Sequence, residues 1–320
     1  MTGGRWLGAA LAALSILVAG ARDGAAQAYP QRPVRLVVPA PAGGPTDVPA
    51  RLVAEGLSNL TGQRFVVENR VGAGGIIAAE SVARADPDGY TLLYANTSVL
   101  AVNPALQPKL PYDAATAFAS IGFVSNSPQL LIANPKLPVK NVQELVAYAK
   151  ANPGKLRYVT PGVASSPHLA GAELWRKAGV DLTDVPYAGE ASGFPHLLTG
   201  EVDLGIITTS GVASQRLRPL AVFATERVKR YPDVPTVAEL GFPILPSGYG
   251  GLFVRAGTPA PVIARLEAAC REATADQAYQ DLAEKQFQQS SYLDRDAFTA
   301  RLDADYKSKA ALIPTLKLPE

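Results

Sequence analysis

Residues 34–69 read VRLVVPAPAGGPTDVPARLVAEGLSNLTGQRFVVEN, with two apolar runs on either side of a helical pattern. The runs at 34–40 and 64–69 are rich in valine and predict buried strands. Between them, apolar residues from Val48 to Leu60 recur at helical spacing, and Gly62 ends the helix. The order strand, helix, strand predicts a parallel sheet with helices on its faces.

The same alternation continues along the chain and predicts an α/β fold. Further strands are expected at 90–95, 119–125, 129–133, 156–160, 182–187, 202–208, 217–224 and 248–254. Further helices are expected at 72–85, 141–154, 166–179, 192–200, 259–274, 276–287 and 294–312.

The composition is that of a globular protein. The chain has 320 residues, of which 48% are hydrophobic and 18% charged, enough for one large or two medium domains. A formal net charge of +2 gives no indication of a nucleic-acid surface. The single cysteine, Cys270, lies on the apolar face of a predicted helix, so no internal disulfide is expected.

The first residues have the pattern of a signal peptide. Arg5 precedes an apolar run at 6–21, and AQA at 26–28 supplies small residues before a cleavage site after Ala28. This predicts export to the periplasm, and no cysteine follows that would make a lipoprotein. A membrane anchor is the alternative, but the run is shorter than the ~20 residues that a spanning helix needs.

Several classes of active site are excluded by their missing motifs. GAGGII at 72–77 has isoleucine where a dinucleotide-binding fingerprint needs its third glycine, and neither a P-loop nor a hydrolase elbow occurs. The chain has two histidines, His168 and His196, too few for most metal sites, so no metal or cofactor is expected. A triad of Ser166, His168 and a distant aspartate stays open, although two residues so close on a helix diverge.

Small polar residues follow the predicted strands. These turns lie at 39–47, 68–75, 95–98, 160–168, 186–193 and 208–211. The carboxyl ends of strands in an open α/β sheet are where ligands bind, and hydroxyls, N–H groups and helix N-termini attract anions.

Five stretches together resemble the Bug family, the extracytoplasmic solute receptors of the tripartite tricarboxylate transporter type. They are 29–58, 65–93, 154–174, 185–204 and 230–243, including VRLVVPAPAGGPTD, KLRYVTPGVASSPHLAGAEL and RYPDVPTVAELGFP. The resemblance extends from about Tyr29 to the C-terminus.

The resemblance implies a two-domain periplasmic-binding-protein (Venus flytrap) fold, type II-like, with two crossings between the domains. Domain 1 would comprise 29–125 and 225–320, and domain 2 would comprise 126–224. The implied function is a monomeric receptor, not an enzyme, that captures a small carboxylate and presents it to integral-membrane transporter subunits. A sensor of the same ligands and an exported α/β hydrolase are the alternatives.

The resemblance also implies the ligand-binding residues, on loops that face each other across the cleft. Carried over residue by residue, they are Ala42, Gly43, Gly44, Thr46, Asp47, Asn96, Thr97, Ser98, Ser165, Ser166, His168, Tyr187, Gly189 and Thr209, with Thr208 and Ser210 as weaker candidates. Asp47 is equally compatible with a helix N-cap or a first-turn acid, Tyr187 with core packing and His168 with a polar filler near a helix start.

Three features depart from the family pattern. Pro167 replaces a small polar residue and removes an N–H donor. Residues 205–222 are several residues shorter than usual, which predicts a reduced helix there. The stretch 246–251, PSGYGG, stands where an aromatic residue is often found and predicts a roomier cleft.

Overall fold

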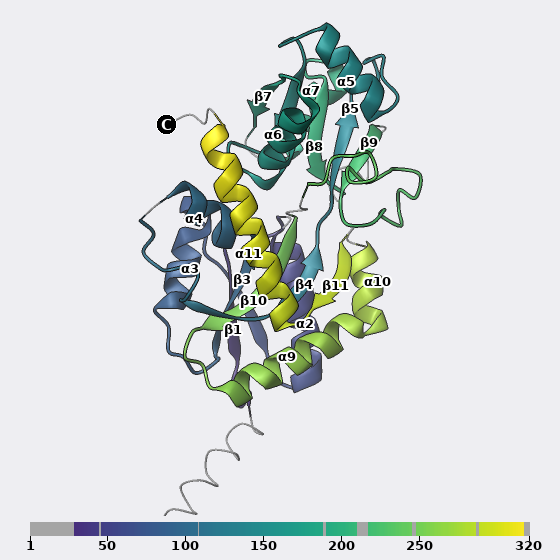
Figure 1. Ribbon diagram of the computed structural model, residues 1–320. Coiled ribbons are helices and arrows are strands. Elements are labelled where there is room, and N and C mark those ends of the chain that lie inside the picture. The colour runs from purple at the N-terminus through teal and green to yellow at the C-terminus, as the bar shows by residue number, and fades with distance from the viewer. Residues whose placement is uncertain are drawn as a thin grey trace, which may run out of the picture.

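The computed structural model describes residues 29–44, 46–107, 109–187, 190–209, 217–244, 248–285 and 288–316, and it forms two α/β domains (Figure 1). The proposed signal peptide, residues 1–28, lies outside the described residues. No helix within those ranges combines the length and apolar character that a membrane span needs.

Domain 1 is built on a six-stranded mixed sheet with the order β11-β4-β10-β3-β1-β2. Its strands are β1 (Val34–Val38), β2 (Phe65–Asn69), β3 (Thr91–Asn96), β4 (Phe118–Asn126), β10 (Tyr249–Arg255) and β11 (Gln289–Leu293). The pairs of β1 with β2 and β3 are parallel, as the sequence predicts, whereas β10 lies antiparallel between β3 and β4.

Helices cover both faces of this sheet. They are α2 (Asp47–Thr61), α3 (Ile76–Ala83), α9 (Ala260–Ala275), α10 (Gln277–Lys285) and α11 (Arg295–Leu312). The apolar side chains of β1 alternate between two cores: Leu36 packs with α2 and α9, and Val37 packs with α3 and α11. Cys270 lies in the first core, fully buried.

Domain 2 has a five-stranded sheet with the order β7-β6-β8-β5-β9. Its strands are β5 (Gln129–Ala133), β6 (Arg157–Thr160), β7 (Thr183–Pro186), β8 (Leu204–Thr208) and β9 (Arg218–Phe223). Its helices are α5 (Val142–Ala151), α6 (Ser166–Ala178) and α7 (Glu190–Thr199). Helix α5 begins with the capping box that its sequence contains, because the Asn141 side chain accepts the Glu144 N–H.

The chain crosses between the domains twice, and the second crossing differs from the sequence prediction. The first crossing joins β4 to β5. The second was expected near Ala224, but Val228, Val237 and Ile244 bury their side chains in the cores of domain 2. Residues 225–244 therefore belong to domain 2, and the chain returns to domain 1 after Ile244.

Some elements have no counterpart in the prediction. A turn of π-helix, η2 (Ser98–Val102), and α4 (Asn103–Leu106) follow β3, and the polar edge strand β11 follows α10. The glycines at 72–75 form a short 3₁₀ turn, η1 (Ala73–Gly75), before α3. The helix expected to be reduced between β8 and β9 falls on residues outside the described ranges.

Asp47 braces the loop between β1 and α2. Its side chain is fully buried and accepts hydrogen bonds from the Gly43 N–H, Arg51 Nε and Asn69 Nδ2, each at 2.7 Å. Burial by itself raises the pKa of Asp47, but the bonds from Arg51, Asn69 and Gly43 outweigh it and hold the pKa below its ordinary value. The ionised carboxylate therefore stabilises this loop.

Replacing Asp47 by asparagine should lower the free energy of unfolding at pH 7 by about 2 kcal/mol, because the bonds to a charged acceptor are lost. A lowered folded-state pKa means that this contribution is complete above the unfolded-state pKa of about 4 and disappears as the pH falls through the folded-state value. Urea denaturation from pH 7 to pH 3 measures it. Asp88→Asn, in the exposed pair of Asp88 with Arg32, is the matched control and should cost less than about 1 kcal/mol. If both variants lose the same free energy of unfolding, Asp47 does not stabilise the loop more than an exposed ion pair does.

Helix α11 holds an aromatic cluster against domain 1. Phe298 is fully buried, and its ring centroid lies 5.4 to 5.9 Å from those of Phe123, Tyr249 and Phe253. The contacts with Phe123 and Tyr249 are edge-to-face, an arrangement that adds to the energy of area burial. Figure 1 shows α11 lying along domain 1, with its C-terminal end next to domain 2.

Phe298→Ala should destabilise domain 1 by about 4 kcal/mol through loss of apolar burial and the cavity left behind. Tyr306→Ala, on the exposed face of the same helix, is the control and should cost about 0.5 kcal/mol. Urea denaturation followed by near-ultraviolet circular dichroism reports both. A small loss for Phe298→Ala would show that the cluster does not anchor α11.

Candidate ligand-binding cleft

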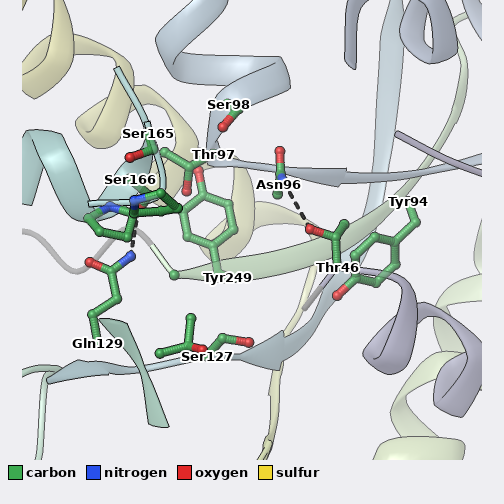
Figure 2. Close-up of a pocket in the computed structure, with 14 residues that line it drawn as sticks. Thr46, Tyr94, Asn96, Thr97, Ser98, Ser127, Gln129, Ser165, Ser166 and Tyr249 are labelled. Carbon is green, nitrogen blue, oxygen red and sulfur yellow. Dashed lines mark hydrogen bonds between the residues drawn. The ribbon is translucent and has the colours of Figure 1, made fainter. Parts of the chain in front are cut away.

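A cavity with a volume of about 290 Å³ lies where the two domains meet. Figure 2 shows that side chains from both domains and from the crossing segments reach it. The lining residues are Thr46, Tyr94, Asn96, Thr97, Ser98, Ser127, Gln129, Pro161, Ser165, Ser166, Pro167, Thr208, Gly248 and Tyr249.

The domain 1 wall is formed by the end of β3, the start of α2 and the start of β10. Asn96 Nδ2 donates to Thr46 Oγ1 at 3.4 Å, which joins the end of β3 to the start of α2 (Figure 2). The Tyr249 hydroxyl donates to Asp305 Oδ2 at 2.9 Å. Burial and the neighbouring Asp305 carboxylate raise the pKa of Tyr249 well above its ordinary value, so this wall presents a neutral phenol.

The domain 2 wall is formed by the start of α6 and the end of β8. Ser165 caps α6, since its hydroxyl accepts the His168 N–H at 3.3 Å. The Ser166 hydroxyl accepts a hydrogen bond of 2.7 Å from Gln129 Nε2, at the start of β5 (Figure 2). These two serines therefore face the cavity from the first turn of one helix.

The crossing segments form the floor between the walls. The Ser127 N–H donates to the Gly248 carbonyl oxygen at 2.6 Å, and the Ser127 hydroxyl donates to Gln288 Oε1 at 2.6 Å. Both crossings are thus tied together directly beneath the cavity.

The described lining residues combine hydroxyl and amide groups with apolar surface from prolines and tyrosine rings, and they carry no formal charge. Hydroxyl and amide side chains provide their polar atoms, and none of the fourteen lining residues is a lysine, arginine, histidine, aspartate or glutamate. The side-chain oxygens of Asn96 and Gln129 are buried without a hydrogen-bond partner. Within the described residues, no cluster of histidine, cysteine or carboxylate side chains could hold a metal ion. The cleft therefore suits a small polar solute.

The structure places six of the predicted ligand-binding residues on the cavity. They are Thr46, Asn96, Thr97, Ser98, Ser165 and Ser166, together with the weaker candidate Thr208. Those that do not line the cavity are Ala42, Gly43, Gly44, Asp47, His168, Tyr187 and Thr209. Gly189 and Ser210 lie outside the described residues.

The residues that miss the cavity have other partners. The N–H groups of Gly43 and Gly44 are donated within their own loop, to Asp47 and to the Pro41 carbonyl oxygen. Thr209 donates its N–H to Pro128. The N–H groups of Gly43 and Gly44 already have acceptors in this structure, and their role as backbone donors to a ligand stays a prediction.

Three side chains support the structure behind the cleft. Asp47 braces its loop and does not reach the cavity, which favours the alternative of a first-turn acid. Tyr187 stacks beside His196, with ring centroids 4.9 Å apart, and packs against a domain 2 core. His168 is buried, with Nδ1 bonded to the Ala164 N–H at 3.0 Å and Nε2 facing Asp184 at 3.8 Å.

The sequence analysis did not identify several other residues that line the cavity, among them Tyr94, Ser127, Gln129, Gly248 and Tyr249. Tyr94 lies inside a strand and Gln129 starts one, positions that a search of loops passes over. Ser127 and Gly248 belong to the crossings, whose proximity depends on the tertiary fold. Tyr249 lies in the PSGYGG stretch, where a roomier cleft was predicted, and its ring occupies that wall.

Comparison with known proteins agrees with this architecture. The model of the tripartite tricarboxylate transporter family receptor matches residues 49–318. Protein BugT of Bordetella pertussis is 36% identical over 272 residues, 82% of this chain and 83% of BugT.

Two solved structures of Rhodopseudomonas palustris proteins share the fold. One, determined with adipate, is 30% identical with a TM-score of 0.78 and covers 91% of this chain and 99% of its own. The other, MatC with bound malate, is 29% identical with a TM-score of 0.73, covering 89% of this chain and 100% of its own. With its two α/β domains, its double crossing and its cleft, this chain belongs to the Bug family of tripartite tricarboxylate transporter receptors.

Proposed function

We propose that this protein is a periplasmic receptor that captures one small carboxylate in the cleft and delivers it to a tripartite tricarboxylate-type transporter in the membrane. One observation carries the proposal: the N-terminal ends of α2 and α6, from opposite domains, meet at the same cavity. Thr46 precedes α2, Ser165 caps α6, and both line it. The N-terminal end of a helix favours a bound anion.

The ligand is a mono- or dicarboxylate that also carries a hydrogen-bond donor. None of the described residues that line the cavity is cationic, so among them hydroxyls, amides and helix ends would hold the anion. Gln129, which is 2% exposed, has an unpartnered side-chain oxygen, and so does Asn96. A hydroxyl or N–H group of the ligand would satisfy such an acceptor. The relatives whose structures hold malate and adipate support a ligand of this size.

Binding favours closure of the two domains. A ligand that contacts Thr46 on one wall and Ser166 on the other stabilises the arrangement in which both are within reach. The two crossings, at Ser127 and Gly248, are where the backbone would bend. The closed monomer is the form that a membrane partner would recognise, after export and cleavage behind Ala28.

The position of the buried His168 imidazole favours a binding protein over a serine hydrolase. The two ring nitrogens of His168 face Ala164 and Asp184, and the hydroxyls of Ser165 and Ser166 are engaged with His168 N–H and Gln129. A serine nucleophile needs an imidazole nitrogen within hydrogen-bond distance of its hydroxyl. The described geometry therefore gives no support to a hydrolase.

A panel of organic acids should reveal the ligand class by thermal shift. A ligand at a hundred times its dissociation constant adds about 2.7 kcal/mol to stability, which raises the melting temperature by roughly 5 to 10 °C. Matched pairs such as malate and succinate, which differ by one hydroxyl, test the need for a donor. A larger shift for the hydroxylated partner is expected. A panel in which no carboxylate shifts the melting temperature would refute the proposed function.

Variants on opposite walls should weaken the binding of whichever acid the panel identifies. Thr46→Val and Ser166→Ala each remove one hydroxyl, which should reduce affinity about five- to tenfold without unfolding the chain. Ser81→Ala, on α3 where the hydroxyl bonds only to the Ala78 carbonyl oxygen, is the matched control. Isothermal titration calorimetry measures all three. If Ser166→Ala binds as tightly as the parent protein, domain 2 does not contribute that hydroxyl to the ligand.

A further inference from the structure

The imidazole of His168 is enclosed behind the serines of the domain 2 wall. The residue is 7% exposed and lies in the first turn of α6. Nδ1 accepts the Ala164 N–H at 3.0 Å, while Nε2 lies 3.8 Å from Asp184 Oδ2 on β7. The backbone N–H of the same residue donates to Ser165. His168 is therefore bonded twice to the loop that precedes its own helix.

These contacts define the protonation state of the ring. Because Nδ1 is an acceptor, the neutral ring carries its proton on Nε2, toward Asp184. Burial lowers the pKa of His168, although Asp184 opposes this, and burial raises the pKa of Asp184. The Thr160 hydroxyl donates to Asp184 at 2.8 Å, and Tyr158 is the other titratable group near this carboxylate. The pocket thus favours a neutral imidazole.

The bond to Ala164 stabilises an unusual turn. Ala164 has a φ of +57°, in the left-handed region, where a residue with a Cβ is disfavoured. The turn closes with the Ser165 N–H donating to Gly162 at 3.2 Å, and it directs the chain into α6. Ser165 and Ser166, which line the cavity, follow immediately.

We propose that His168 is a positioning residue of the cleft: its neutral ring, through Nδ1, holds the left-handed turn at Ala164 and so aims Ser165 and Ser166 at the ligand. The part that concerns the ligand rests on the proposed function, whereas the part that concerns the turn does not. Protonation would place an N–H of the ring against the Ala164 N–H, so the turn would be released and affinity would fall in acid.

The ring can be tested without a ligand. The sequence contains only two histidines, and the other, His196, is exposed and paired with Glu201. Nitrogen-15 NMR of the imidazoles, with His196→Gln to assign the signals, should show at pH 7.5 an unprotonated Nδ1 and a protonated Nε2 for His168. A proton on Nδ1, or a charged ring at this pH, would overturn the proposal.

Two substitutions separate positioning from packing. In His168→Asn the amide oxygen stands near the position of Nδ1 and keeps an acceptor, whereas His168→Leu fills the space without one. Hydrogen exchange of the Ala164 amide should be roughly tenfold faster in the leucine variant and near the parent rate in the asparagine variant, as expected for one lost hydrogen bond. Unchanged exchange in the leucine variant would refute the role.

Binding then tests the consequence for the cleft, with malate and adipate as probes. His168→Leu should bind roughly tenfold more weakly and His168→Asn should retain most of the affinity. Only the parent protein should lose affinity as the pH falls through the folded-state pKa of His168, which burial places below the ordinary value of about 6.5. Adding Ala164→Gly to His168→Leu should recover part of the loss, since glycine tolerates a positive φ. Equal affinity of the leucine variant and the parent would refute positioning. If neither probe nor any other carboxylate binds the parent protein, the proposed function fails. The NMR and hydrogen-exchange results then still show whether His168 holds the turn at Ala164.

Discussion

The hydrogen bond from Ser127 to Gly248 ties together the two segments that join the domains, and the location of the cleft depends on it. The approach is so close that a Cβ on Gly248 would lie 2.0 Å from the Ser127 carbonyl oxygen. Gly250 and Gly251 are equally restricted, because a Cβ there would collide with Tyr94 and Phe298. Glycines in this stretch therefore bring backbone and rings together, with Tyr249 between them facing the cavity.

Formal charges near the cleft are paired behind its walls. Asp47 is neutralised by Arg51 beneath one loop. Asp305, which receives the Tyr249 hydroxyl, lies 3.7 Å from Lys309, and both are fully buried. Burial raises the pKa of Asp305, whereas Lys309 and Arg301 of the same helix lower it. The Arg301 guanidinium lies 5.4 Å from the centroid of the Tyr249 ring, on the side of the aromatic cluster that this helix covers. Under the proposed function, a solute would meet the hydroxyl and amide groups of the described lining residues, and none of those side chains is charged.

The sequence predicts the helices and strands better than it predicts the strand order and the positions at which the chain crosses between the domains. Helical spacing of apolar residues locates α2, and valine-rich runs locate β1 and β2. The capping box at Asn141 starts α5 where local hydrogen bonding requires it. The return crossing was misplaced because Val228, Val237 and Ile244 have no periodic pattern, although they bury themselves in domain 2. The order of strands, with β10 antiparallel between β3 and β4, depends on long-range pairing that no local pattern specifies.

The fate of the predicted site residues follows from how much local bonding each can satisfy. Asp47 and His168 each accept a backbone hydrogen bond within their own loop. The Gly43 N–H donates to the Asp47 carboxylate, and the Ala164 N–H donates to His168 Nδ1. Thr46 and Ser166, each close in sequence to one of them, bear a hydroxyl that reaches the cavity. The Asp47 carboxylate would repel a carboxylate ligand, whereas the hydroxyls of Thr46 and Ser166 can donate a hydrogen bond to one. In these two loops, Asp47 and His168 hold the backbone through hydrogen bonds, and the neighbouring hydroxyls of Thr46 and Ser166 remain available to a ligand.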